Sequence, residues 1–381
     1  MAQASFAFDD AGVAASPVTS STPQQGPGRH GRHPLAAAAW ASADDSEPDE
    51  AWQIGWEHAR HGLVPPPAHL LPGHPVRQGW DAGRLCFRQR TRTANHAVHA
   101  WLSLRLSTWQ QGRAFEPVQV TPHYLSQLMQ GRCPVLRQAV NDGTPTAAVG
   151  VVDAVNSSAG VAAGNLAMLS TAAWAARANR RWDEARLMAV VAEAHPDGEA
   201  EGLTSPQWAR LAALLSYVTP LPHAVAAGIP MRVLPTNRLR LLNPIQGLQA
   251  LITLQLTHAD WSERAAQLAT LLPETQTELR SDFHLFFHSL LPRAWDGGRP
   301  ADARALRERL EDAWAQPQVI RRWQRFASRL NAEQAEQLVT RAVKLGLAGK
   351  ESMVQLHGAA QATEGWALET GGYGRGSVTR T

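Results

Sequence analysis

Residues 133–136 read Cys-Pro-Val-Leu, and residues 151–177 read Val-Val-Asp-Ala-Val-Asn-Ser-Ser-Ala-Gly-Val-Ala-Ala-Gly-Asn-Leu-Ala-Met-Leu-Ser-Thr-Ala-Ala-Trp-Ala-Ala-Arg. These two runs say most about the fold. The apolar residues around 149–155 predict a short β-hairpin, and the small polar residues at 156–160 predict its loop. A helix is expected to follow from about Asn165. This part of the chain is expected to hold most of the β structure.

The pattern resembles the zinc-stapled finger of the HNH endonucleases. Active members of that family show Cys-Pro-x-Cys, then Asp-His, then Gly-x-x-x-x-Asn-Leu, then Cys-x-x-Cys-Asn-x-x-Lys. The matching residues within 133–177 are Cys133, Asp153, Asn165, Leu166 and the basic Arg177. The positions of the histidine and of three zinc ligands hold Ala154, Leu136, Ser170 and Ala173. The resemblance implies a degenerate, treble-clef-like ββα finger.

The residues that are missing from the family pattern limit the chemistry that we expect of this segment. Ala154 cannot act as a general base, so we expect no catalytic residue and favour a non-enzyme, with a residual metal-dependent nuclease as an alternative. One thiolate cannot build a structural zinc site, so neither a metal nor a cofactor is expected. Asp153 and Asn165 are assigned structural roles as residues that hold the loop amides. Packing is expected to replace the zinc through Leu166, Met168, Leu169 and Trp174.

Two boxes of glycine and tryptophan lie toward the N-terminus. They read Gly55-Trp56-Glu-His-Ala-Arg-His-Gly62 and Arg77-Gln-Gly79-Trp80-Asp-Ala-Gly83, and a proline-rich connector separates them. Residues 51–84 are similar to the ribosome modulation factor family, in which two such boxes close as a helical hairpin against ribosomal RNA. The family's Cys-Pro is absent from the connector. The likeness implies either RNA binding or a structural core in which Trp56 packs against Trp80 and glycines permit close helix approach.

Positive charge is concentrated in one quarter of the chain. Residues 51–140 carry ten arginines against three acids, a net charge of +7, while residues 1–50 carry −5. Such a concentration is typical of a surface that docks a polyanion. The candidate nucleic-acid contacts in this quarter are Arg77, Arg84, Arg88, Arg90, Arg92 and Arg105. A second set, Arg321, Arg322 and Arg325, lies beside Trp323 and Phe326 and suits phosphate contacts plus stacking, or a solvated helix face.

Residues 88–111 are expected to form a helix with Thr93 as its candidate cap. Three arginines at a helix start oppose the helix macrodipole. Arg88, Arg90 and Arg92 therefore imply either a bound anion or a helix that begins after them.

After a linker of glycine and acidic residues at 196–202 the chain is expected to be almost wholly helical. Helix starts are marked by Ser205-Pro206, Asn243-Pro244 and the capping box Asp260-Trp-Ser-Glu263. Further helices are expected at about 275–291, 300–315, 318–330 and 332–345. Helices of this length with short turns predict a bundle or an array of helical hairpins.

The whole chain is thus predicted to be mainly α (α+β). The expected parts are a disordered arm at 1–48, a basic helical module at 49–120, the degenerate finger at 121–195, a helical domain at 203–348 and a mostly flexible tail at 349–381. Cys86 and Cys133 are too few for a disulfide-stapled secreted protein, and no signal-like start or membrane-length apolar run is evident. A cytoplasmic protein is expected.

The leading hypothesis is a nucleic-acid-binding protein of bacterial mobile-element or phage-related ancestry, with structured RNA or the ribosome favoured over DNA. One alternative is a helical adaptor whose C-terminal helical domain binds a protein partner. The residual nuclease is the other. Salt dependence separates the first two, because phosphate contacts weaken steeply as salt rises.

Overall fold

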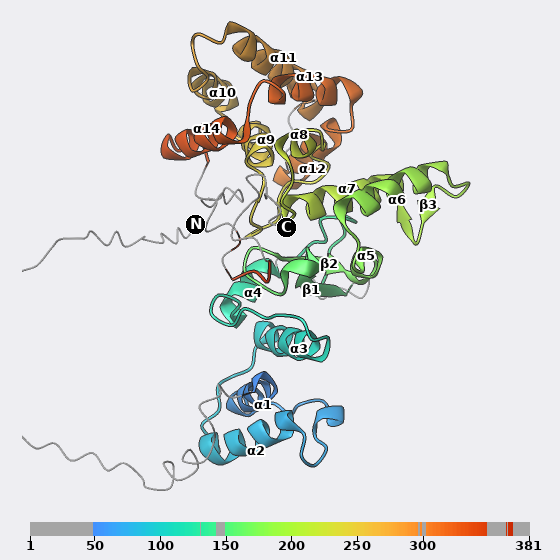
Figure 1. Cartoon of the computed structure of the whole chain (residues 1–381), viewed down its shortest axis with the longest axis vertical. Helices are drawn as coiled ribbons and strands as arrows, with labels where there is room; N and C mark the ends of the chain where they lie inside the picture. Colours follow the sequence, from blue (N-terminus) through green and yellow to red (C-terminus); the bar gives the residue numbers. More distant parts are fainter. Residues whose placement is uncertain are drawn as a thin grey trace, which may run out of the picture. The chain divides into compact units, whose positions relative to one another are not determined.

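The computed structural model describes residues 49–129, 131–141, 149–295, 298, 302–348, 363 and 365–368. Within them the chain is mainly helical with two small antiparallel sheets, which confirms the predicted fold class (Figure 1). The described residues from 49 onward belong to one compact unit. The arm predicted at 1–48 lies outside the described residues, as does most of the tail predicted at 349–381.

The first helices of the described chain are α1 (Glu50–Arg60), α2 (Pro75–Phe87) and α3 (His96–Gln110), which form the module predicted at 49–120, and α4 (Pro122–Leu128), which follows it. The Asn95 side chain caps α3 by accepting a hydrogen bond from the Val98 amide at 3.0 Å. The helix predicted from residue 88 therefore begins later, and the predicted cap Thr93 is wrong. Asn95 has the extended backbone and the side-chain acceptor that a cap requires.

Helices α1 and α2 pack as a very close hairpin. A Cβ atom on Gly55 would lie 1.8 Å from the Val76 carbonyl oxygen, and one on Gly79 would lie 1.9 Å from the Trp52 carbonyl oxygen. Real Cβ atoms do not approach other atoms so closely. The two glycines therefore set the distance between the helices, as the sequence predicted.

The middle of the chain forms a ββα arrangement. Strand β1 (Gly150–Ala154) pairs antiparallel with β2 (Leu166–Ser170), and α5 (Thr171–Arg177) follows directly. The predicted helix start at about Asn165 is wrong. The next five residues form strand β2, and the helix begins only at Thr171. All five β2 residues are buried, and a continuous apolar run fits a buried strand as well as a buried helix.

A second hairpin replaces the predicted linker. Helix α6 (Trp182–Ala194) packs against α7 (Ser205–Tyr217), and the short strands β3 (Glu199–Ala200) and β4 (Leu203–Thr204) connect them. Thr204, not Ser205, is the N-cap of α7 and forms a capping box with Gln207. Residues 196–202 are thus the tip of a helical hairpin.

The C-terminal part consists of α8 (His223–Ala227), α9 (Pro244–Gln255), α10 (Trp261–Thr270), α11 (Thr277–Ala294), α12 (Ala303–Ala313), α13 (Pro317–Ala327) and α14 (Ala332–Lys344). An aromatic cluster at its centre contains Phe286, Trp314, Trp323 and Phe326. Neither predicted cap acts through its side chain: Asn243 instead accepts from the Leu221 amide, and Asp260 makes no capping bond.

A short part of the predicted tail is packed against the loop between β1 and β2. Trp366 is buried, and its indole Nε1 donates to the Ala163 carbonyl at 2.8 Å. The Ala367 amide donates to the Ala159 carbonyl at 3.0 Å. These described tail residues therefore contribute to the fold, which the prediction of a mostly flexible tail did not include.

Candidate nucleic-acid interface

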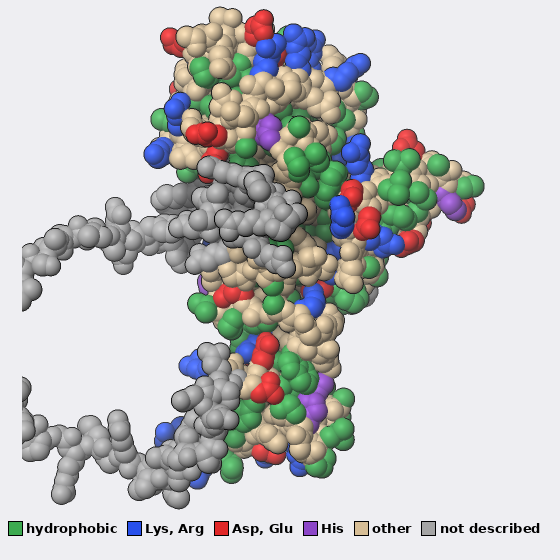
Figure 2. Space-filling model, in the orientation of Figure 1, with side chains coloured by type: hydrophobic (Ala, Val, Ile, Leu, Met, Phe, Trp, Pro, Cys, Tyr) green, Lys and Arg blue, Asp and Glu red, His purple; other side chains and the backbone are tan. Residues whose placement is uncertain are grey.

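Four exposed arginines follow one another at the end of α2. Arg84 lies in the last turn of that helix, and Arg88, Arg90 and Arg92 lie on the segment that leads to α3. Within the described ranges none of the four has an ion pair. We call these four residues the arginine cluster. Figure 2 shows basic side chains at the edge of the part that contains the α1–α2 hairpin, next to acidic, histidine and apolar side chains.

The backbone of this segment is anchored even though its side chains are exposed. Arg88 has a φ of 50°, which ends α2, and its amide donates to the Arg84 carbonyl at 3.0 Å. The Arg92 amide donates to the carbonyl of Arg60 at the end of α1 at 2.8 Å. Helix α3 begins only at His96, so these arginines do not oppose its macrodipole. The segment presents its guanidinium groups from a fixed backbone.

Neighbouring arginines of the basic quarter have partners. Arg60 lies 2.8 Å from the Glu57 carboxylate. Arg77 donates to the Leu70 carbonyl at 2.8 Å and lies 3.4 Å from the Asp81 carboxylate. Arg77, a predicted contact, is therefore partly neutralised within its own helix.

Arg105 was also predicted to contact nucleic acid, but the residue is buried and the prediction is wrong. Only 4% of the residue is exposed, and its guanidinium lies 5.0 Å from the ring centre of Trp101 and 5.3 Å from that of Phe115. Burial lowers the pKa of Arg105, which the Glu50 carboxylate opposes. The guanidinium fills the core of the module and cannot reach a phosphate.

The two tryptophans of the boxes take different positions. Trp56 stacks on Trp52 with ring centres 5.1 Å apart and meets the edge of Phe87. Trp80 donates its indole Nε1 to the Leu63 carbonyl at 2.9 Å, and the Arg84 guanidinium lies 4.6 Å from its ring centre. The expected packing of Trp56 on Trp80 is not among the ring contacts of the described residues. Each indole still has a structural role in the hairpin.

The arginines of the second predicted set, on α13, differ in their exposure and in their ion pairing. Arg321 is exposed and Arg322 is half-buried, whereas Arg325 lies 2.9 Å from the buried Asp282 carboxylate. Trp323 and Phe326 are buried in the aromatic core and cannot stack on a base. This helix thus offers fewer groups to a nucleic acid than the sequence predicted.

Asp153 is the centre of a buried ion cluster. Its Oδ1 accepts from Arg113 Nη1 at 3.0 Å and from the Ala154 amide at 2.8 Å. Its Oδ2 accepts from Arg177 Nη2 at 2.8 Å and from the Trp174 indole at 2.9 Å. Burial lowers the pKa of Arg177, and the Asp153 carboxylate opposes that shift. Four donors occupy the carboxylate, so its role here is to join elements.

Asn165 holds the loop between the two strands. Its fully buried amide donates to the carbonyls of Asn156 and Gly160, both at 2.8 Å, and accepts from the Asn156 amide at 2.9 Å. These bonds close residues 156–165 on themselves. The predicted loop-holding role of Asn165 agrees with this geometry.

The positions that correspond to zinc ligands lie in the core. Cys133 and Ala173 are fully buried, Ser170 caps α5, and Leu136 packs against the core. No group of three or more His, Cys, Asp or Glu side chains with a geometry that suits a metal occurs in the described part of the chain. Trp174 is 39% exposed, so of the four residues expected to replace zinc, Leu166, Met168 and Leu169 form the buried set.

We expect the melting temperature to be unchanged by EDTA. Structural zinc contributes folding free energy directly, whereas apolar packing does not respond to a chelator. Thermal unfolding with and without EDTA, together with elemental analysis, checks this. Stoichiometric zinc that is lost in Cys133→Ser would contradict the expectation.

Comparison with protein-family models, with curated proteins and with solved structures returned no match. Both resemblances seen in the sequence therefore stay predictions. Across the described helices, none combines the length and apolar character of a membrane span. Sequence reasoning missed Arg113 as a partner of Asp153, because no local signal links residues forty positions apart.

Proposed function

We propose that this protein binds nucleic acid through the arginine cluster, with structured RNA favoured over DNA. It acts without catalysis, in the cytoplasm of a bacterium, and derives from a mobile element or phage. The predicted likeness of residues 51–84 to ribosome modulation factors favours a ribosomal or similarly folded RNA as the partner.

One observation carries the proposal: four exposed guanidinium groups within nine residues lack an ion pair among the described residues. Guanidinium groups bind phosphates in a bidentate manner, and clusters without neutralising acids favour polyanions. The anchored backbone lowers the conformational entropy that binding would cost. Trp80 beneath Arg84 holds that side chain in place by a cation–π contact.

Replacing Arg84, Arg88, Arg90 and Arg92 together by glutamine should weaken binding to an RNA hairpin and reduce its salt dependence. Each phosphate contact contributes about 0.7–0.9 to the slope of log affinity against log salt. Loss of four contacts should therefore flatten the slope by roughly three units. Fluorescence anisotropy over a salt series, with an RNA hairpin and a DNA duplex of equal length, measures both quantities.

A matched control removes the same charge elsewhere. Arg186, Arg293, Arg341 and Lys344 are exposed and have no ion pair within the described ranges. Their quadruple glutamine variant should keep most of the slope. If both variants bind alike, or if the parent protein binds neither RNA nor DNA at about 50 mM salt, the proposal is wrong.

A protein adaptor is the second candidate function. It is favoured by apolar side chains on the solvent side of α6, which precedes the C-terminal helical domain where a protein partner was expected from the sequence. Leu187 and Val190 of this helix are 61% and 59% exposed. Exposed apolar residues in neighbouring turns of a helix suit a protein partner. An adaptor would bind its partner with little dependence on salt, which the same salt series distinguishes.

A further inference from the structure

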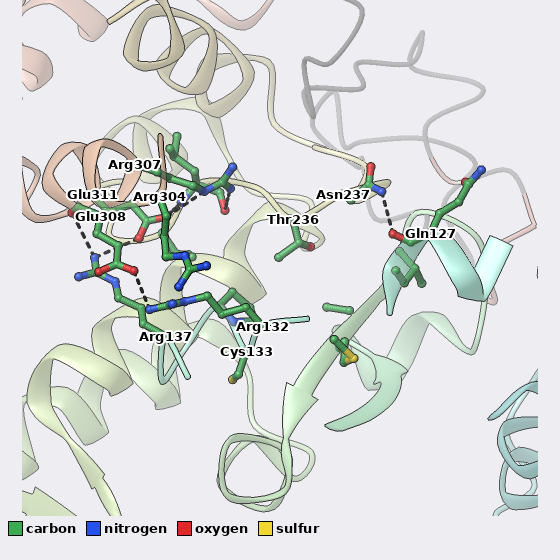
Figure 3. A pocket seen from close by; sticks show the side chains of 16 residues that line it. Gln127, Arg132, Cys133, Arg137, Thr236, Asn237, Arg304, Arg307, Glu308 and Glu311 are labelled. Carbon is green, nitrogen blue, oxygen red and sulfur yellow. Dashed lines mark hydrogen bonds and ion pairs between the residues drawn. The ribbon is translucent and has the colours of Figure 1, made fainter. Parts of the chain in front are cut away.

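A cavity of about 250 Å³ lies between the turn at 132–137, the segment 233–237 and helix α12. Figure 3 shows a cluster of charged side chains at one end and the amides of Asn237 and Gln127 at the other. A volume of this size holds a small organic molecule and is close to the lower limit of ligand pockets. Nothing in the proposed nucleic-acid function uses this cavity.

The charged end carries more cations than anions. Its lining contains four arginines and two glutamates, Glu308 and Glu311. Glu311 is buried and is fully engaged, because Arg137 Nη2 and the Leu234 amide donate to it at 3.0 and 2.9 Å and Arg307 Nε lies 3.5 Å from its carboxylate. Arg137 also binds Asp312, which lies outside the lining. These ion pairs do not neutralise all four arginines, so the charged end of the cavity keeps a net positive charge.

Arg304 supplies the unused charge. Its side chain lines the cavity and has neither an ion pair nor a side-chain hydrogen bond among the described residues. Figure 3 shows it directed toward Arg132. Arg132 lies 2.6 Å from Glu308 in a half-buried ion pair, so a stronger anion could share its guanidinium.

Two further polar atoms in this lining lack a partner. Thr236 Oγ1 and Arg137 Nε are both shielded from solvent and make no hydrogen bond within the described residues. A buried donor without an acceptor is costly, and such groups in native proteins call for an explanation. A ligand or a water in the cavity would satisfy the Thr236 hydroxyl.

The remaining wall is apolar. Leu128 and Cys133 are buried there, and Met168 and Val233 lie beside them. A ligand that fits must therefore combine an anionic group with a compact apolar body. A free inorganic ion would leave this wall without a contact.

We propose that the cavity binds a small organic phosphate, with its phosphate near Arg304 and Arg132 and its apolar part against Met168 and Leu128. A phosphate group has more acceptor oxygens than a carboxylate, and it can take guanidinium and hydroxyl donors together. The site goes beyond the proposed function, since it lies on other elements than the arginine cluster.

Phenyl phosphate is a direct probe because it joins the two features. Isothermal titration of the full chain should show binding of phenyl phosphate that is at least about tenfold tighter than that of inorganic phosphate or phenol, because each lacks one of the two contacts. Benzoate tests whether a carboxylate suffices, and binding as tight as that of phenyl phosphate would overturn the choice of phosphate.

Arg304→Gln should weaken phenyl phosphate binding about tenfold or more, since it removes a charged hydrogen bond. Thr236→Val should also weaken binding while leaving the melting temperature unchanged or higher, because the lost hydroxyl has no partner in the described protein. Arg186→Gln, an exposed arginine outside the cavity, is the matched control. Absence of phenyl phosphate binding, or equal affinity in Arg304→Gln and Arg186→Gln, would overturn the site.

The two proposals fail separately. Arg304→Gln should leave RNA binding and its salt slope unchanged. The arginine-cluster variant should in turn bind phenyl phosphate as the parent protein does.

Discussion

Replacing Asp153 by alanine is expected to destabilise the folded unit by about 3–5 kcal/mol. The carboxylate accepts hydrogen bonds from Arg113, Arg177 and Trp174, and the Arg177 side chain is only 5% exposed. Without Asp153, the Arg177 guanidinium is left buried without its counter-charge. Arg177 Nε and Nη1 already lack a partner among the described residues, so nothing nearby compensates. Urea unfolding followed by tryptophan fluorescence measures the loss.

The control for this prediction is an exposed pair of the same chemistry. Arg77 and Asp81 are 40% and 51% exposed, so Asp81→Ala should cost at most about 1 kcal/mol. The double variant Asp153→Ala, Arg177→Met should be less destabilised than the sum of its single variants, because both charges leave together. A cost for Asp153→Ala no greater than that for Asp81→Ala would refute the central role of the cluster.

The double variant Gly55→Ala, Gly79→Ala is expected to separate α1 from α2. Each added Cβ atom would lie less than 2 Å from a backbone carbonyl oxygen of the facing helix, at 1.8 and 1.9 Å. Alanine favours a helix by roughly 1 kcal/mol per site, but overpacking against a rigid backbone costs about 1–3 kcal/mol or more at each. Helices must therefore move apart, which exposes Ala51, Ile54 and Val76.

Hydrogen exchange of residues 50–87 is the suitable measurement, because opening of this hairpin need not unfold the rest of the chain. Exchange there should rise by at least tenfold, which corresponds to about 1.4 kcal/mol. Gln78→Ala adds an alanine on the exposed side of α2 and should change little. Unchanged exchange in the glycine variant would mean that the helices are not held at this distance.

The local signals of the sequence account for most of the helices. Proline in the first turn marks the starts of α7 and α9, and apolar spacing marks α11 to α14. These signals act over a few residues. The close approach of α1 and α2 was likewise readable from Gly55 and Gly79, because only glycine permits it.

Strand β2 shows where a local signal is insufficient. Residues 165–170 read Asn-Leu-Ala-Met-Leu-Ser, and an apolar run of this length suits either a helix or a buried strand. Pairing with β1 decides the outcome, since the register from Gly150 with Ser170 to Ala154 with Leu166 satisfies the backbone groups of both. The choice between helix and strand therefore depended on the pairing partner β1. The periodicity within one segment does not specify such a partner.

The arginines show, for the candidate sites, the same difference between what local sequence determines and what only the tertiary structure decides. Composition alone determined that residues 51–140 are strongly basic and that two cysteines are too few for a four-cysteine zinc site. Only the tertiary structure decided that Arg105 is buried, that Arg177 joins Asp153, and that Arg304 lines a cavity without an ion pair among the described residues. The physical reason is that charge and helix propensity are properties of a residue and its near neighbours, whereas burial and ion pairing depend on segments that lie far apart in the chain.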